Sequence, residues 1–467
     1  MAIIDFFDRG WRINPEGTAY IQGERHWSFN EIGALSCQIA NRLLADGLGK
    51  GAKGAVWAGN DVKSWACTLG VCRSNAAWFP LNARSSIDDI LHVLNSFDCD
   101  VLFYQSAFAG QIDEVRSRLS NIRQWICVDE ECGSDCSLDQ WIAAQPDTAP
   151  TVEVDLDDLV MLSPTGGTTG LPKGVMNTHR STQTFVAHFM MSCHYAADEM
   201  PVNLAAAPMT HTAGLLSVPC TARGGTVVVL EKPDAGPMLN AIETHKVSEF
   251  FLPPTVIYRL LDIPGIEKLD FSSLRYFLYG AAPMSVEKLK KAIDVFGPVM
   301  TGGYGQTEAP ASIAFLTPDE HFEDRRLAAD ERLTSVGRPN PLVRVEIMDD
   351  DNRILAPGES GEICVRGDLV MKGYYKAPEK TAETIIDGWL HTGDIGHLDA
   401  QGYLHITDRK KDMIISGGFN VYPSEVEQVL WGHEAVQDCA VIGVPDEQWG
   451  EAVKAVVELN QGAGVDE

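Results

Sequence analysis

The chain has 467 residues, which at about 150 residues per domain leaves room for roughly three compact units. Apolar residues make up 45% and charged residues 22%, a composition that excludes intrinsic disorder. The net charge of −28 excludes a broad basic surface for nucleic acid or for an anionic membrane. No apolar run approaches the ~18 residues of a membrane span, and Asp5 and Asp8 lie where a secretory signal needs an unbroken apolar stretch. We expect a cytoplasmic protein without integral membrane association or a nucleic-acid partner, and a homodimer stays open.

The cysteines give no sign of a disulfide framework. There are eleven, and only Cys132 and Cys136 lie within four residues of each other. An odd count without CxxC spacing predicts reduced thiols in the cytoplasm. A zinc site at this pair would need further ligands at matching spacing, which the sequence lacks.

Helical and β-rich segments alternate through the first part of the chain. The apolar spacing predicts helices over 29–44, 64–75 and 86–96, and buried strands at AVWAGN (55–60), 77–81 and 101–104. This alternation predicts an α/β fold with largely parallel sheets covered on both faces. Between 336 and 375, short strands separated by Gly, Pro and Asp turns predict a small antiparallel barrel or sheet, and 402–407 adds a second antiparallel signature. The charged segment that follows, 408–412, is interpreted as a linker.

The segment TGGTTGLPKG, residues 165–174, has the composition of a phosphate-binding loop. It follows the β-rich run 159–162; its glycines allow backbone N–H groups to converge on an anion, and Lys173 supplies a positive charge. Taken alone, it would more often be an ordinary glycine-rich turn. A P-loop NTPase is excluded, because Pro172 precedes the lysine and Gly174 follows it, where that motif needs Gly and a hydroxyl residue.

This loop resembles the phosphate loop of the adenylate-forming enzymes, the superfamily of acyl-CoA and aryl-CoA ligases, firefly luciferase and nonribosomal peptide adenylation domains. It departs from the pattern [ST]-S-G-[ST]-T-G-x-P-K-G only at Gly166, which replaces a serine. Further segments resemble the family in the same order: PMTHTAG (208–214), YGAAP (279–283), GGYGQTE (302–308), WLHTGD (389–394) and the stretch 408–427. Singly, each has an ordinary alternative, such as a solvated carboxylate or a turn residue. Together they identify the chain as a member of this family.

The resemblance implies ATP-dependent activation of a carboxylic acid to an acyl-adenylate, followed by transfer to coenzyme A. It assigns ATP or AMP contacts to Thr165, Gly166, Gly167, Thr168, Thr169, Gly170, Lys173, Gly280, Ala281, Ala282, Gly303, Tyr304, Gly305, Gln306, Thr307, Asp394 and Arg409. It assigns catalytic roles to His211, Thr307, Glu308 and Arg409, with Glu308 holding Mg²⁺, and it places the acyl group at His211, Gly214, Gly302 and Gly303. Tyr304 would stack on adenine, and Asp394 would accept the ribose hydroxyls.

The resemblance also implies a division of the chain. A large N-terminal domain, 1–407, would contain two layered α/β subdomains and a small β-barrel. A hinge, 408–412, would pivot at Lys411, and a partial α+β C-terminal subdomain, 413–467, would bring Gly417 and Gly418 to the coenzyme A thiol. Nothing after Glu427 matches the P-[KR]-[ST]-x-x-G-K setting of the family's adenylation lysine. We therefore expect a truncated subdomain and slow adenylation by this chain.

Two alternatives to a CoA ligase stay open, as does the substrate. One is an acyl-adenylating enzyme that loads a carrier protein; the other is a non-catalytic acyl-nucleotide-binding protein. The amino acid version of the first is disfavoured, because 208–214 carries no aspartate to pair with an ammonium group. Small residues at Gly214, Gly302 and Gly303 favour a roomy pocket for a bulky or aromatic acid over aliphatic acids, although packing alone could also require them.

Overall fold

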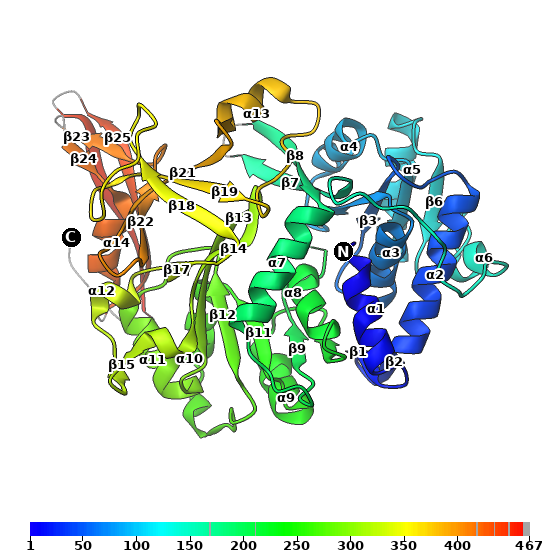
Figure 1. Ribbon diagram of the computed structural model, residues 1–467, viewed down its shortest axis with the longest axis horizontal. Coiled ribbons are helices and arrows are strands. Elements are labelled where there is room, and N and C mark those ends of the chain that lie inside the picture. Colours follow the sequence, from blue (N-terminus) through cyan, green and yellow to red (C-terminus); the bar gives the residue numbers. More distant parts are fainter. Residues whose placement is uncertain (168–169, 211, 417–418, 434, 447–448, 461–467) are drawn as a thin grey trace.

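The structure is a computed structural model, and it describes residues 1–167, 170–210, 212–416, 419–433, 435–446 and 449–460. The described chain forms two large α/β sheets, one antiparallel sheet, a two-stranded ribbon and a small C-terminal sheet (Figure 1). The first two strands of the chain join the second large sheet. This arrangement confirms the predicted α/β class with a large N-terminal part and a small C-terminal part. No described helix has the length and apolar character needed to cross a membrane.

The first sheet has six strands in the order β6-β5-β3-β4-β7-β8. Their bounds are β6 (Gln124–Cys127), β5 (Val101–Tyr104), β3 (Lys53–Trp57), β4 (Ala77–Leu81), β7 (Leu159–Gly167) and β8 (Gly170–Thr178). Its helices are α2 (Phe29–Ala45), α3 (Val62–Arg73), α4 (Ile87–Ser96), α5 (Ala109–Arg118) and α6 (Leu138–Ile142), with the 3₁₀ turn η1 (Ser106–Phe108). The predicted helices and strands of this region are confirmed. β4 is buried along its whole length, as expected for a central parallel strand.

Local chemistry explains where α2 begins. Ser28 accepts a hydrogen bond from the backbone N–H of Glu31, and the Glu31 carboxylate accepts one from the backbone N–H of Ser28. This reciprocal capping satisfies two N–H groups that a helix start leaves without partners. From there the apolar positions at a spacing of three and four residues face the core.

The second sheet has nine strands in the order β17-β14-β13-β12-β11-β9-β10-β1-β2. The bounds are β17 (Arg338–Pro339), β14 (Ala309–Leu316), β13 (Met300–Gln306), β12 (Tyr276–Gly280), β11 (Glu249–Leu252), β9 (Val202–Ala205), β10 (Thr226–Val229), β1 (Thr18–Gln22) and β2 (Arg25–Ser28). Its helices are α1 (Ile4–Ile13), α7 (His179–Ser192), α8 (Thr212–Thr221), α9 (Ala235–His245), α10 (Pro254–Leu261) and α11 (Val286–Phe296). Figure 1 shows α7 and α8 between the two large sheets. The apolar residues of α9, α10 and α11 pack on the opposite face.

The third unit is an antiparallel sheet of five strands, in the order β18-β19-β21-β20 with β22 beside β21. The bounds are β18 (Val343–Met348), β19 (Gly361–Gly367), β20 (Ile385–Ile386), β21 (Trp389–Leu398) and β22 (Leu404–Arg409); α13 is Pro378–Thr384. Shorter elements lie before or within this region: η2 (Ile266–Lys268), η3 (Pro318–His321), β15 (Phe322–Glu323), β16 (Arg326–Leu327) and α12 (Asp330–Leu333). The predicted antiparallel region is thus confirmed.

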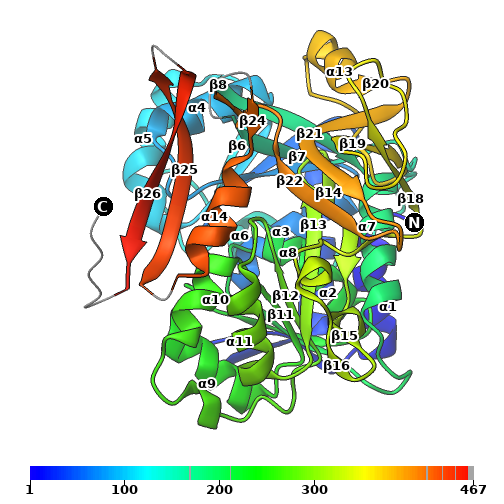
Figure 2. The same cartoon turned by 90° about the vertical axis from the view of Figure 1, so that its left-hand side faces the viewer.

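A four-stranded sheet in the order β24-β23-β26-β25 ends the described chain. It comprises β23 (Ile414–Ser416), β24 (Phe419–Val421), β25 (Val436–Asp446) and β26 (Gly450–Leu459), with α14 (Pro423–Trp431) packed on β25. Figure 2 shows this sheet and α14 as a separate layer beside α10. The amide of Gln437 donates to Asp262 at 3.3 Å, which links this layer to the end of α10.

Candidate active site

The predicted phosphate loop is a β-hairpin made by β7 and β8. Thr165 lies opposite Lys173 in the register, and its hydroxyl donates to the Lys173 carbonyl at 3.4 Å. The Lys173 side chain is exposed, and its Nζ lies 5.6 Å from the ring centre of Tyr374. Thr168 and Thr169 lie outside the described residues. The hairpin therefore presents its lysine toward the segment that follows β19.

Tyr374 connects the phosphate loop to the predicted magnesium ligand. Glu308 lies with Thr307 in the turn between β13 and β14, and its Oε1 accepts a hydrogen bond from the Tyr374 hydroxyl at 2.6 Å. The Glu308 carbonyl also accepts from the backbone N–H of Met371 at 2.8 Å. Sequence reasoning missed Tyr374, and the run MKGYY (371–375) after a predicted strand was the one available signal.

A second cluster lies where the nine-stranded and five-stranded sheets meet. The Tyr304 hydroxyl donates to Oδ2 of Asp394 at 2.6 Å, and the Arg409 Nε lies 3.7 Å from Oδ1. Asp394 and Arg409 are Cα partners on β21 and β22. Burial raises the pKa of Asp394 above its ordinary value and raises the pKa of Tyr304 well above its own. The structure thus brings together three residues that the sequence assigned to the nucleoside and α-phosphate.

The loop that would lie against adenine is held tightly at the end of β12. A Cβ on Gly280 would lie 2.5 Å from the Gly303 carbonyl oxygen, so only glycine fits there. Ala281 has a φ of +67°, a strained conformation for an L-residue that the surroundings must impose. Gly305 packs as closely, since its Cβ would meet the backbone of Ala311 at 2.5 Å. The strands β12, β13 and β14 therefore approach one another through backbone alone at this edge.

The glycines predicted for the acyl pocket have packing explanations. A Cβ on Gly214 would lie 2.1 Å from the Met209 carbonyl oxygen and 2.5 Å from the Trp65 ring. A Cβ on Gly302 would lie 2.9 Å from the Tyr279 hydroxyl oxygen. Their small size is required by the fold and is no longer evidence of a roomy pocket. Gly303 is less confined, with the Phe315 ring 3.3 Å from its Cβ position.

Asn60 holds the loop that leads to His211, which itself lies outside the described residues. The Asn60 amide donates to the carbonyl oxygens of Ala207 and Leu230, both at 2.8 Å, and accepts from the Met209 backbone N–H at 2.7 Å. A side chain from the connection between β3 and α3 thus fixes a loop of the second sheet. Sequence reasoning missed Asn60, because a lone Asn after a strand carries no specific signal.

The predicted hinge lies between two sheets. Asp408 and Arg409 complete β22 of the five-stranded sheet, and residues 410–412 lead to β23 of the C-terminal sheet. The Lys410 ammonium forms ion pairs with Asp350 at 2.8 Å and Glu362 at 3.5 Å. Lys411 is exposed within this turn. Gly417 and Gly418 lie outside the described residues, so their predicted coenzyme A contact stays a prediction.

The described residues contain no group of three or more His, Cys, Asp or Glu side chains that could hold a metal ion. Glu308 supplies one carboxylate, and its bond to Tyr374 leaves further acceptor positions on the two oxygens. A Mg²⁺ ion takes few protein ligands when substrate phosphates complete its shell. The site therefore fits a magnesium ion that is shared with bound ATP.

Comparisons with known proteins identify the family that shares this fold. The AMP-binding enzyme family matches residues 7–375, and the AMP-binding enzyme C-terminal domain matches residues 425–467. The chain belongs to this family of adenylate-forming enzymes. It is an AMP-forming acid–thiol ligase, the class that activates a carboxylic acid with ATP and transfers the acyl group to coenzyme A.

Among curated relatives, a feruloyl-CoA synthase from an Amycolatopsis species is 36% identical over 459 residues, 97% of this chain and 88% of that protein. The medium/long-chain-fatty-acid–CoA ligase FadD8 of Mycobacterium tuberculosis is 43% identical over 330 residues, 70% of this chain and 56% of that protein. Among solved structures, the amide bond synthetase McbA from Marinactinospora thermotolerans has a TM-score of 0.89 at 31% identity, covering 99% of this chain and 90% of that one. ATP-bound MatB from Rhodopseudomonas palustris has the same TM-score at 28% identity, with coverage of 99% and 90%.

Proposed function

We propose that this chain activates a ring-bearing carboxylic acid with ATP and passes the acyl group to coenzyme A. The similarity to a feruloyl-CoA synthase across 97% of the chain carries this substrate class. Aromatic walls beside the candidate acyl site agree with it. Phe189 and Phe315 are buried and meet edge to face with ring centres 4.8 Å apart, and the Phe315 ring lies 3.3 Å from the Cβ position of Gly303. Rings pack well on such walls.

The phosphate end of the site supplies positive charge and hydrogen-bond donors. Lys173, whose side chain is exposed on β8, would reach the β- and γ-phosphates with Thr165, and Thr307 would donate to a phosphate oxygen. Tyr374 holds the Glu308 carboxylate in place for Mg²⁺. A bound Mg²⁺ would neutralise phosphate charge as pyrophosphate leaves. The chain's own contribution is to hold two anions together long enough to react.

The nucleoside end supplies an acceptor and a cation side by side. Asp394 keeps acceptor positions for the ribose hydroxyls beside its bond from Tyr304, and Arg409 would approach the α-phosphate side. Transfer to the thiol would follow a rotation about Lys411, which lies in a turn between two sheets. Such a turn can absorb the large φ/ψ change that a hinge needs.

Calorimetry with acyl-adenylate analogues tests the substrate class without requiring turnover. N-Acylsulfamoyl adenosines that carry a cinnamoyl, an octanoyl or an acetyl group would be titrated into the chain. We expect the cinnamoyl analogue to bind at least ~10-fold more tightly than the other two, because it buries more apolar area than the acetyl group and loses less conformational entropy than the octanoyl chain. Tighter binding of the octanoyl analogue would overturn the ring-bearing substrate.

A thioester assay tests the acceptor. Coenzyme A and a phosphopantetheinyl carrier protein would each be offered with a supplied acyl-adenylate. We expect the thioester to form with free coenzyme A. The chain is also 31% identical over 453 residues to ScoC of Streptomyces coeruleorubidus, a fatty acid–[acyl-carrier-protein] ligase, and thioester formation on the carrier alone would favour that activity.

A further inference from the structure

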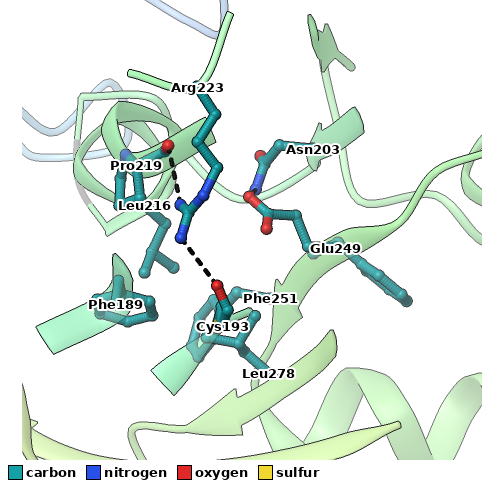
Figure 3. A pocket seen from close by; sticks show the side chains of 10 residues that line it. Phe189, Cys193, Asn203, Leu216, Pro219, Arg223, Glu249, Phe251 and Leu278 are labelled. Carbon is teal, nitrogen blue, oxygen red and sulfur yellow. Dashed lines mark hydrogen bonds between the residues drawn. The ribbon is translucent and has the colours of Figure 1, made fainter. Parts of the chain in front are cut away.

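A small cavity lies between the nine-stranded sheet and the helices α7 and α8 (Figure 3). Its volume of about 10 Å³ is room for one water-sized group. Apolar side chains from helices and strands form most of its wall, and Asn203, Arg223 and Glu249 bring polar groups to it. The lining residues are Phe189, Cys193, Asn203, Leu216, Pro219, Arg223, Glu249, Phe250, Phe251 and Leu278.

Strand register places this cavity below the candidate acyl site on the same face of the sheet. Gly280 lies beside Gly303 at the carboxyl edge of β12 and β13. Leu278 lies two residues before Gly280 on β12 and is paired with Phe251 of β11. Tyr276 lies two residues before Leu278, and its partner on β11 is Glu249. Alternate residues of a strand share a face. A distance of four residues, at about 3.3 Å each, places Glu249 ~13 Å inward from the edge of the sheet at Gly280 and Gly303.

Glu249 is a buried carboxyl held by two neutral donors. It is 5% exposed, Oε2 accepts from the Tyr195 hydroxyl at 2.8 Å, and Oε1 accepts from the Asn203 amide at 3.2 Å. A carboxylate offers about four acceptor positions, so two remain. Burial raises its pKa. Leaving such a group incompletely satisfied is costly, and a further donor would offset that cost.

Arg223 does not pair directly with Glu249. Its Nη1 donates to the Pro219 carbonyl at 3.1 Å, and its Nη2 donates to the carbonyls of Met190 at 3.2 Å and Cys193 at 2.8 Å. In Figure 3 the guanidinium lies across the cavity from the Glu249 carboxyl. Its positive charge beside the cavity disfavours a cationic ligand group. A neutral hydroxyl, which donates without adding charge, is therefore the group that fits.

We propose that Glu249 is a specificity-determining residue that accepts a hydrogen bond from a hydroxyl at the far end of the acyl substrate. The inference rests on the proposed function, because it requires the acyl group to run inward from Gly303 along this face of the sheet. The hydroxyl would occupy the water-sized cavity, with the hydrocarbon or ring against Phe251 and Leu278. The substrate is thus an acid that carries a terminal hydroxyl.

The test compares matched pairs of acyl-adenylate analogues that differ by one hydroxyl. The pairs are 4-hydroxycinnamoyl and cinnamoyl, and 8-hydroxyoctanoyl and octanoyl, each as the N-acylsulfamoyl adenosine titrated into the full chain. The wild-type chain should bind the hydroxylated member of the better-bound pair at least ~10-fold more tightly, since a buried acceptor rejects an analogue that leaves it unpaired. An equal affinity within both pairs, or no binding of either pair, would overturn the proposal.

Variants separate recognition from a purely structural role of Glu249. Glu249→Leu should abolish the preference for the hydroxyl, whereas Glu249→Gln, which keeps an acceptor oxygen, should retain part of it. Ser273→Ala removes a hydroxyl that donates to the Val247 carbonyl rather than to Tyr195, Asn203 or Glu249, and should leave the preference intact. A structural role would change the melting temperature and both affinities equally. If Glu249→Leu fails to fold, the test rests on Glu249→Gln, and a preference for the hydroxyl as large as that of the wild type would contradict the proposal.

The same titrations distinguish a failure of the proposed ring-bearing substrate from a failure of the proposed hydroxyl contact. Stronger binding of the octanoyl pair would overturn the ring while the hydroxyl preference is still measured within that pair. Tight but equal binding of both cinnamoyl analogues would support the ring and overturn the role of Glu249.

Discussion

The hydroxyl of Tyr304 donates a 2.6 Å hydrogen bond to Asp394, 90 positions later in the sequence. Tyr304 belongs to β13 of the nine-stranded sheet and Asp394 to β21 of the antiparallel sheet. Both side chains are largely buried, and burial raises the pKa of each. The pair proposed to bind the nucleoside therefore forms only when these two sheets are docked, so we expect nucleotide binding to depend on their packing.

Loss of the Asp394 carboxylate should weaken nucleotide binding. In Asp394→Ala, we expect the affinity for ATP or an acyl-adenylate analogue to fall by about 1–3 kcal/mol, because the Tyr304 hydroxyl and the ribose hydroxyls lose their acceptor. Isothermal calorimetry measures this directly. Asp351→Ala removes an exposed carboxylate near the same sheet and should bind as the wild type does. An unchanged affinity in Asp394→Ala would refute the ribose assignment.

Removal of the Tyr374 hydroxyl should weaken the binding of Mg²⁺. Tyr374→Phe deletes the bond to Glu308 and should reduce the apparent Mg²⁺ affinity in ATP titrations by roughly 0.5–1.5 kcal/mol. Tyr375→Phe is the matched control, because the Tyr375 hydroxyl donates to Asp98 and not to Glu308. Equal effects of the two variants would show that the loss is one of general stability.

A fixed backbone at the predicted hinge should separate the two half-reactions. Lys411→Pro restricts φ and should preserve the half-reaction that matches the fixed orientation while suppressing the other by ~10-fold or more. Pyrophosphate release measures the first half-reaction, and thioester formation from supplied adenylate measures the second. Lys411→Ala removes the side chain without restricting φ and should leave the rates of both half-reactions unchanged. Equal losses in both assays for the proline variant would contradict a pivot at this residue.

Three buried histidines should make the fold sensitive to mild acid. Burial lowers the pKa of His179, His188 and His321 to about 4 from 6.5. Each ring is hydrogen-bonded in the neutral form; the backbone N–H of Leu342, for example, donates to Nε2 of His188 at 3.2 Å. Below pH 6.5 the unfolded chain binds protons that the folded chain does not.

The free energy of unfolding should therefore be highest above pH 6.5 and fall as the pH drops toward 4, by up to about 3 kcal/mol per histidine. Urea unfolding at a series of pH values measures this slope. His188→Gln should flatten it, and His26→Gln, at an exposed position, should not. An identical slope in His188→Gln would show that protonation of His188 does not contribute to the acid sensitivity.

The sequence by itself determined the elements whose signals are local, along with the order of the family motifs. The periodicity over 29–44 was enough to predict α2, because a helix is set by contacts three and four residues apart, and the structure added the capping residue Ser28. The phosphate loop, Glu308, Asp394 and Arg409 were identified from motifs in which neighbouring residues carry the signal.

Only the tertiary structure decided which distant side chains complete the site. Tyr374 reaches Glu308 across 66 positions, and Asn60 reaches the Met209 loop across 149. The register of β11 and β12 places Glu249 below the proposed acyl site. It also decided that Gly214 is small because Trp65 and the Met209 carbonyl leave no space for a side chain. Such relationships arise from sheet order and docking, in which one residue has many sequence-distant candidates for a partner, so no local pattern encodes them.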